Sequence, residues 1–424
     1  MELNPGQRVH LITKKGNFDC TVLDSPSREI ILIKLDSGYN IGIREEEIID
    51  VKELGPERVK PLPKFLSPKR DLPKIALVVT GGTISAKLDG RTGAVHWLTD
   101  PKELLNFYPE LLDIAQVVKI DMPFTKASEN MDQKEWKSLS ECVFNLASDK
   151  DISGIIVTHG TDFLHYSSSA LSFSLQNLNK PVVFTYSQRS SDRASSDARL
   201  NLKSAAKVAI SDIAEVVIVG HENINDDSCL ILRGTKARKM HTSRRDSFRP
   251  INTRAIGKVS EKGIEIMDKY NPRSKNQINL LEKFSDKVAL IKFYPGQDPK
   301  LIDWYVDNGY KGLVIEASGL GHVLTLESKN NWLPSIKKAI KKEVIICITP
   351  QTLYGKLDPL VYSNGRELEK TGAIFLGDML PETAFVKLCW VLGNQKLKNN
   401  VRENMLKNFA GEFNEFLKKD EFLN

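Results

Sequence analysis

From residue 74 onward, short apolar runs alternate with amphipathic stretches. The runs are rich in Val, Ile, Ala and Leu without polar alternation, which is typical of strands buried on both faces of a parallel sheet. We expect strands at residues 75–80, 154–158, 182–187, 216–220, 228–233, 288–293, 312–316, 344–349 and 373–376. Between them lie helical patterns, such as the capping-box sequence Asp132–Glu135 followed by Trp136, Leu139 and Val143 at helical spacing. The alternation predicts an α/β fold with two domains and mostly parallel sheets.

The first fifty residues follow a different pattern. Four short apolar runs at residues 8–13, 18–23, 29–35 and 39–43 are separated by turn sequences such as Lys15-Gly16-Asn17. Closely spaced short strands of this kind predict a small β-barrel of the SH3-like type.

Two polar segments separate these units. Residues 60–73 carry Pro61, Pro63, Pro68 and Pro73 among lysines, the composition of a stiff, exposed linker. A second polar stretch begins at Tyr270. We therefore predict a β-barrel at 1–59, a linker at 60–73, an α/β domain with the catalytic residues at 74–269, a linker at 270–287 and a second α/β domain at 288–424.

Composition narrows the function classes. The chain has 424 residues, 41% apolar and 27% charged, the values of an ordinary soluble protein. No apolar run reaches the roughly 18–20 residues that span a bilayer, and the start lacks a signal-peptide pattern, so we expect a cytoplasmic protein. The five cysteines are scattered and lie apart from the seven histidines, which argues against a disulfide framework and a metal site. A net charge of +6 permits a nucleic-acid partner without requiring one.

Two turns at strand ends carry the candidate chemistry. Thr80-Gly81-Gly82-Thr83 follows the first buried strand, and His159-Gly160-Thr161-Asp162 follows the second. In open α/β sheets ligands bind beyond the carboxyl ends of the strands, so Thr83 and Thr161 would converge on one ligand if their strands are close. A threonine hydroxyl is a weak nucleophile unless another group takes its proton, and Asp162 and a lysine are available. The other interpretation of a Gly-Gly sequence after a buried strand is a tight turn without function.

Both turns closely resemble the two signatures of the bacterial-type L-asparaginase family, and their joint presence in this order is a specific signal. The resemblance implies an amidohydrolase in which Thr83 attacks a side-chain amide. Thr161, Asp162 and a distal lysine would handle protons. That lysine is best placed at Lys239, which follows a predicted strand and precedes a hydroxyl-rich stretch. For the basic residues around it we favour a solvated face or an RNA contact; these are Arg233, Lys236, Arg238, Arg244, Arg245 and Arg249.

The resemblance also implies a substrate site. Ser128 and Glu129, in Ala127-Ser-Glu-Asn-Met131, match the loop that holds the substrate's α-amino and α-carboxylate groups, and Asp162 would meet the α-ammonium. Backbone amides around Gly82 and Thr161 would form an oxyanion hole. One departure is plain: the family's lid tyrosine, shortly after the first motif, has no counterpart between Ser85 and Trp97. His96 is a candidate proton carrier there, although a loop histidine is more often solvated.

The barrel and the sequences at 91–95 and 238–248 resemble the D-subunit family of archaeal glutamyl-tRNA(Gln) amidotransferases. This resemblance implies release of ammonia from glutamine or asparagine. The ammonia would pass to an E subunit that uses ATP and Mg²⁺ to amidate Glu-tRNA(Gln), so we expect no cofactor on this chain. D subunits would pair as a dimer flanked by E subunits, a heterotetramer that meets tRNA(Gln) as a complex, away from membranes. The alternatives are a stand-alone L-asparaginase or glutaminase and, less favoured because all four catalytic candidates are present, a non-enzymatic RNA-binding module.

Overall fold

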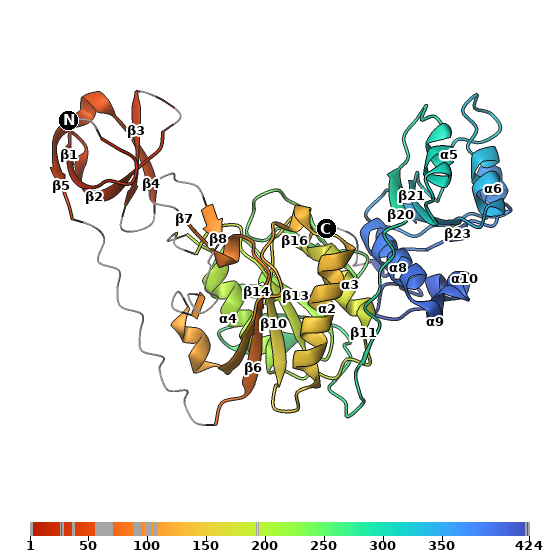
Figure 1. The fold of residues 1–424 in the computed structure, drawn as a ribbon, viewed down its shortest axis with the longest axis horizontal. Helices are drawn as coiled ribbons and strands as arrows, with labels where there is room; N and C mark the ends of the chain where they lie inside the picture. The colour runs from red at the N-terminus through yellow and green to blue at the C-terminus, as the bar shows by residue number, and fades with distance from the viewer. Residues whose placement is uncertain are drawn as a thin grey trace.

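A computed structural model describes residues 3–25, 27, 29–35, 39–55, 71–88, 95–97, 104–105, 108–191, 193, 195–419 and 422. The predicted linker at 60–73 lies outside the described residues except for 71–73, and residues 89–94 of the expected lid segment lie outside them as well. Figure 1 shows an N-terminal body of strands, a central α/β body and a second α/β body in chain order.

The N-terminal body is an antiparallel sheet of five strands in the order β4-β3-β2-β1-β5. Its own core contains Val9, Leu11, Val22 and Ile33, which confirms the small barrel-like domain. The sequence predicted four of the strands and missed β5, in which only Ile48 and Val51 are partly buried among exposed residues. The bounds are β1 Arg8–Thr13, β2 Gly16–Leu23, β3 Ile30–Leu35, β4 Asn40–Arg44 and β5 Ile48–Glu53.

The central body is built on an eight-stranded sheet in the order β18-β17-β14-β13-β12-β10-β6-β9. The strands from β13 to β9 run parallel, whereas β14, β17 and β18 are antiparallel. The bounds are β6 Lys74–Val79, β9 Gln116–Asp121, β10 Gly154–Thr158, β12 Val182–Thr185, β13 Val216–His221, β14 Ser228–Arg233, β17 Gly257–Ser260 and β18 Gly263–Ile266.

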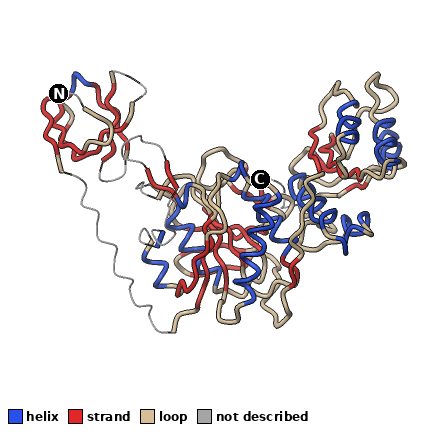
Figure 2. Tube along the Cα trace, viewed as in Figure 1, coloured by secondary structure: helices blue, strands red, loops and turns tan. Residues whose placement is uncertain are grey.

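Alternate residues of the central strands face different helices, as the two-residue period of a strand requires. On β6, Ile75 and Leu77 pack with the core that α4 (Ala198–Ala209) covers, and Val78 packs with the core under α2 (Gln133–Ser148) and α3 (Leu164–Ser174). Figure 2 shows these helices against the central sheet. The predicted capping box of α2 forms, with Asp132 and Glu135 as its two members. Burial on both faces therefore explains the apolar strands.

The C-terminal body has a parallel sheet in the order β20-β21-β22-β23. Its strands are β20 Val288–Lys292, β21 Gly312–Ala317, β22 Ile345–Pro350 and β23 Ile374–Phe375. Its helices are α5 Lys300–Asp307, α6 Leu333–Lys341, α7 Ser363–Glu369, α8 Pro381–Gly393, α9 Gln395–Lys398 and α10 Val401–Leu406. These two bodies confirm the predicted α/β fold. No helix in the described ranges has the length and apolar character needed to cross a membrane.

The two α/β bodies share a core. Trp136 and Phe173 of the central body pack with Met379 and Trp390 of the C-terminal body, and the rings of Phe173 and Trp390 stack with centroids 5.6 Å apart. The connecting segment also forms structure, because β19 (Asn279–Leu280) pairs with β11 (Leu175–Gln176). Helix α8 is thus fixed against α3.

Candidate functional site

The two threonine turns lie side by side. Strands β6 and β10 are parallel neighbours with Val79 opposite Thr158, so both turns leave the same edge of the sheet. Gly82 has a φ of 80°, and a Cβ built on it would lie 2.5 Å from the backbone nitrogen of Gly160. A side chain there would overlap the second turn, so glycine permits the backbones to touch. The convergence that the sequence predicted for the two motifs is therefore present at the backbone level.

The loop at 126–131 completes this arrangement. The Lys126 amide donates to the Thr80 carbonyl (3.0 Å), and a Cβ on Gly81 (φ 110°) would lie 2.7 Å from the Lys126 carbonyl oxygen. Ser128 is buried, and its hydroxyl accepts a hydrogen bond from the Phe163 amide (3.3 Å). Glu129 is exposed beside it. Ser128 and Glu129, two of the predicted substrate-binding residues, thus lie on a loop that contacts the threonine turns.

Lys239 meets the second motif directly. It lies on β15 (Ala237–Lys239), which pairs with β16 (Phe248–Pro250). Its Nζ donates to Thr161 Oγ1 and to Asp162 Oδ1, both at 2.8 Å. The Lys239 side chain is 10% exposed, whereas that of Asp162 is 60% exposed. Three of the four predicted catalytic side chains form one hydrogen-bonded group, with the carboxylate left accessible to a ligand.

Thr83 is held by its backbone. It begins the short 3₁₀ helix η2 (Thr83–Ser85), whose neighbouring side chain Ser85 contacts the Thr158 hydroxyl at 3.1 Å. Thr83 is partly exposed, and its hydroxyl has no hydrogen-bond partner among the described residues. The backbone position of Thr83 is thus set by the turn, and within the described ranges its oxygen is not engaged. Its predicted role as nucleophile, like the roles of the other site residues, stays a prediction.

The expected lid is described only in part. Strands β7 (Ala86–Leu88) and β8 (Val95–Trp97) form a short antiparallel hairpin directly after Thr83. The residues between them lie outside the described ranges, and so does the side chain of His96. The sequence in this hairpin has no tyrosine that could cover Thr83.

Two buried histidines flank the second motif. His159 is fully buried with Nδ1 2.8 Å from the Gly160 carbonyl oxygen, and burial lowers its pKa to about 4. Burial, with help from Arg238 and Lys239, lowers the pKa of His165 to about 3. Both imidazoles are therefore neutral at pH 7 and add no positive charge beside Lys239.

The prediction of a solvated basic face around Lys239 is wrong for Lys236, which is buried, and holds for Arg244, whose side chain is 49% exposed. Lys236 is 1% exposed and pairs with Asp378, and Arg238 pairs with Glu382 at 3.1 Å. Arg233, Arg244, Arg245 and Arg249 also each contact a carboxylate of the same chain. Sequence reasoning missed both carboxylates: Asp378 lies in the turn before α8, and Glu382 lies in the first turn of α8, where acidic residues are common without any site.

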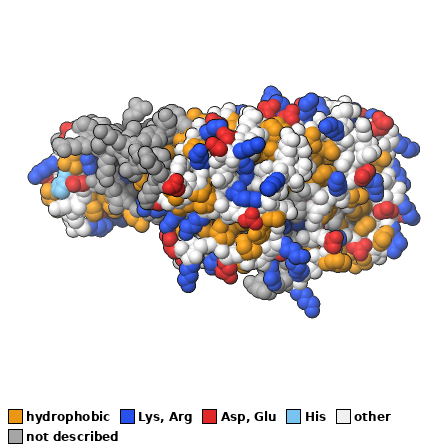
Figure 3. Space-filling model, turned by 90° about the horizontal axis from the view of Figure 1, so that it is seen from below, with side chains coloured by type: hydrophobic (Ala, Val, Ile, Leu, Met, Phe, Trp, Pro, Cys, Tyr) orange, Lys and Arg blue, Asp and Glu red, His pale blue; other side chains and the backbone are white. Residues whose placement is uncertain are grey.

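Charge elsewhere is mixed. On the face in Figure 3, Lys and Arg side chains are interspersed with Asp and Glu and with apolar residues. In the described ranges, no three His, Cys, Asp or Glu side chains are grouped so that they could hold a metal ion.

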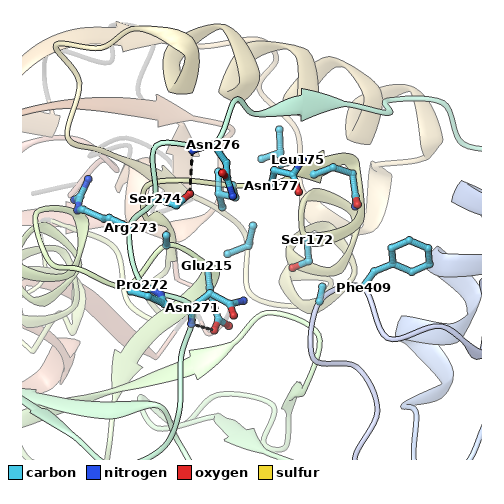
Figure 4. A pocket seen from close by; sticks show the side chains of 15 residues that line it. Ser172, Leu175, Asn177, Glu215, Asn271, Pro272, Arg273, Ser274, Asn276 and Phe409 are labelled. Atoms are coloured by element: carbon cyan, nitrogen blue, oxygen red, sulfur yellow. Dashed lines mark hydrogen bonds between the residues drawn. The ribbon is translucent and has the colours of Figure 1, made fainter.

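A separate cavity of about 450 Å³ lies at the other edge of the central sheet (Figure 4). It is lined by Ala214–Val216 at the start of β13, by α3 and β11, and by the connecting residues 271–276. Glu215 in its wall already accepts hydrogen bonds from Arg233 and from the Asn271 amide. Because the threonine turns follow the opposite ends of the parallel strands, this cavity is not part of the site.

The loop at 318–322 is a tight turn. Ser318 and His322 form an isolated bridge, and Gly321 has a φ of 108°. The Gly-x-Gly spacing there is thus accounted for by backbone geometry.

Comparison with known proteins gives a consistent result along the chain. Residues 3–54 match the GatD N-terminal domain, residues 74–271 match Asparaginase, N-terminal, and residues 287–405 match the Glutaminase/Asparaginase C-terminal domain. The D subunit of the Thermococcus kodakarensis glutamyl-tRNA(Gln) amidotransferase is 44% identical over 99% of this chain and 97% of its own length. The corresponding D subunit from Pyrococcus furiosus is 45% identical over 93% of this chain and 90% of its own length.

Solved structures agree on the α/β part. The thermostable L-asparaginase from Thermococcus kodakarensis superposes with a TM-score of 0.71 at 27% identity, covering 81% of this chain and 100% of that one. L-asparaginase I from Vibrio cholerae gives a TM-score of 0.69 at 25% identity, also with 81% and 100% coverage.

Proposed function

Because this chain belongs to the family of glutamyl-tRNA(Gln) amidotransferase D subunits, which contains asparaginase-type domains, we propose that its threonine turns hydrolyse a side-chain amide to supply ammonia. The observation that carries the proposal is the contact of Lys239 with both Thr161 and Asp162 beside the turn that bears Thr83. The substrate is glutamine or asparagine, and the products are the free acid and ammonia.

The reaction has two steps. Thr83 Oγ attacks the carboxamide carbon, its proton is transferred to the leaving nitrogen through the Thr161–Lys239 group, and ammonia leaves an ester on Thr83. Water then attacks this ester with Thr161 and Lys239 taking its proton, and Thr83 Oγ leaves reprotonated. Backbone amides near Gly82 and Thr161 stabilise the oxyanion in both steps. The sum is amide plus water to carboxylic acid plus ammonia.

Substrate binding relies on charge at the rim of the site. The exposed Asp162 carboxylate pairs with the α-ammonium of the substrate, while its other contact to Lys239 holds it in place. Ser128 and Glu129 bind the remaining α-substituents from the adjoining loop. Among the described residues no base contacts Thr83 Oγ, so on this proposal its full activation requires the arrangement with substrate bound.

As a subunit of an amidotransferase, the chain works in a complex with other subunits. We propose that the partner is the E subunit, that it uses ATP and Mg²⁺, and that ammonia passes to it from Thr83. Two D subunits pair between two E subunits, and tRNA(Gln) is bound by the whole complex. On this proposal the D chain itself holds no cofactor.

A stand-alone L-asparaginase or glutaminase is the second candidate. The likeness to two L-asparaginases supports it, because each of those whole chains is covered. The barrel favours the amidotransferase, because residues 3–54 match the GatD N-terminal domain and neither of the two asparaginase domains.

Ammonia release tests both candidates. We expect release from glutamine to rise when the E subunit and Glu-tRNA(Gln) are added, whereas an unchanged rate would favour the stand-alone enzyme. Thr83→Ala should lower the rate by more than about a thousandfold with the melting temperature retained. Thr371→Val, a hydroxyl removed far from the turns, is the matched control. Turnover retained by Thr83→Ala would refute Thr83 as nucleophile, and no release by the wild type under any condition would contradict both candidates.

A further inference from the structure

The segment that carries Lys239 is fastened to the C-terminal body. We propose that Glu382, in the first turn of α8, is a positioning residue that sets Lys239 through Arg238. The inference rests on the proposed function, because it concerns the same lysine. It assigns to the C-terminal body a direct part in aligning a site whose predicted catalytic residues all lie in the central body.

Two consecutive residues before β15, Thr235 and Lys236, contact α8 and the turn that precedes it. Thr383 Oγ1 donates to the Thr235 carbonyl at 2.9 Å. Lys236 pairs with Asp378, and both side chains are buried. Asp378 also accepts from the Asn414 amide at 3.0 Å, which fixes the carboxylate from its other side. The residues directly before β15 are therefore held in place by specific polar contacts with the C-terminal body.

Of the residues that make these contacts, Arg238 is the nearest in sequence to Lys239. Its guanidinium contacts Glu382 Oε1 at 3.1 Å, and the Glu382 side chain is 7% exposed. Neighbouring residues of a strand point to opposite faces, so Arg238 points to the C-terminal body while Lys239 points to Thr161. A shift of Arg238 along or about the strand thus moves Lys239 with it.

The surroundings of Glu382 indicate that its charge serves this pair. In the described part of the chain, Glu382 Oε2 is buried without a hydrogen-bond partner, and Oε1 also lies 4.0 Å from His165 Nε2, with Tyr166 nearby. Glu316 also faces the group, and burial raises the pKa of that carboxyl. Because His165 is neutral, Glu382 is the carboxylate that balances Arg238 beside Lys239.

Alignment of Lys239 has a narrow tolerance. Its Nζ makes two 2.8 Å contacts at once, with Thr161 and with Asp162. A displacement of about 1 Å in such a group lowers rates on the order of a hundredfold. A positioning residue should accordingly act on kcat more than on KM.

The test compares Glu382→Gln, Arg238→Met and the double variant in the full complex with charged tRNA. Glu412→Gln is the control, because Glu412 is a buried carboxylate that pairs with another α8 residue, Lys387, at 2.7 Å and, among the residues that the structure describes, makes no hydrogen bond or ion pair with β15. We expect each single variant to lower kcat tenfold or more with KM changed less than threefold. The kcat of the double variant should be no lower than that of the less active single variant, because both substitutions remove the same Arg238–Glu382 ion pair. Glu412→Gln should keep kcat within threefold.

Two results would overturn the inference. One is a kcat in Glu382→Gln equal to that of Glu412→Gln, which would mean that the tie serves stability alone. The other is recovery of kcat in the double variant, which would mean that an unpaired charge, not lost alignment, harmed the single variants. Thr83→Ala separates this from the proposed function: if it is inactive while Glu382→Gln is fully active, only the positioning inference fails.

Discussion

Gly82→Ala tests whether backbone contact between the two turns is needed. The change adds one carbon, which would lie 2.5 Å from the Gly160 nitrogen and 2.6 Å from its Cα. Ordinary contacts of this kind begin at 3.4 Å, so the turns must separate by about 0.9 Å, the difference between 3.4 Å and 2.5 Å. A shift close to 1 Å between reacting groups is expected to cost on the order of a hundredfold in kcat/KM.

The backbone conformation has a cost of its own. Gly82 has a φ of 80° and a ψ of 170°, a combination that is essentially confined to glycine, so alanine there costs on the order of 1–3 kcal/mol of folding free energy. Gly296 has the same φ of 80°, and a methyl group added there would meet no atom within 4 Å, so Gly296→Ala is the control for a positive φ without steric overlap.

The assay measures ammonia release and urea denaturation for both variants. We expect Gly296→Ala to lose about 1–2 kcal/mol of stability with activity within twofold of the wild type. Gly82→Ala should lose more stability and at least about a hundredfold in kcat/KM. Activity of Gly82→Ala within threefold of the wild type would refute the reasoning, because the turns would then tolerate separation.

Three further outcomes are expected. Lys239→Met should lower kcat on the order of 10²- to 10⁴-fold, the range for a lost proton-transfer group, and an unchanged kcat in steady-state assays would remove Lys239 from the mechanism. Asp162→Asn should raise KM about 10- to 100-fold through loss of a charge-assisted contact to the substrate ammonium, and an unchanged KM would contradict that contact. His165 has a folded pKa of about 3 against an ordinary value of 6.5, so the unfolded chain binds more protons in acid. The stability that comes from keeping His165 neutral is present above pH 6.5 and is lost as the pH falls toward 3. Between pH 7 and pH 5 the free energy of unfolding of the wild type should therefore fall by about 2 kcal/mol more than that of His165→Asn. Equal losses in urea titrations would disprove the burial argument.

The sequence predicted those parts of the fold that local pattern decides. Buried parallel strands such as Gly154–Thr158 appear in the sequence as apolar runs. The glycine turns could be recognised because they directly follow such runs. Strand β5 at the edge of its sheet was missed because only Ile48 and Val51 are partly buried and the other residues are exposed, so its sequence shows neither an apolar run nor a regular alternation. Whether a strand can be recognised in the sequence depends on which of its faces are buried. The composition of a segment is a clear signal only when both faces are apolar.

The motif residues of the site could be predicted from the sequence, whereas the residues that hold them in place could not. Thr161, Asp162 and Lys239 were found from motif and order, and the structure brings them together. Glu382 lies more than a hundred residues from Arg238 in the sequence, so nothing local marks it as a partner. The error over Lys236 has the same cause: a lysine in a basic run is usually solvated, and only the tertiary fold supplies Asp378.

The shared core of the two α/β bodies has a consequence for how the chain unfolds. Separating them would expose Phe173 and Trp390 and leave Lys236 and Asp378 without each other. Neither body is thus a free-standing module, and calorimetry should show them melting in one cooperative transition. The N-terminal barrel has a core made of its own residues, such as Val9 and Ile33, and should melt as a separate unit.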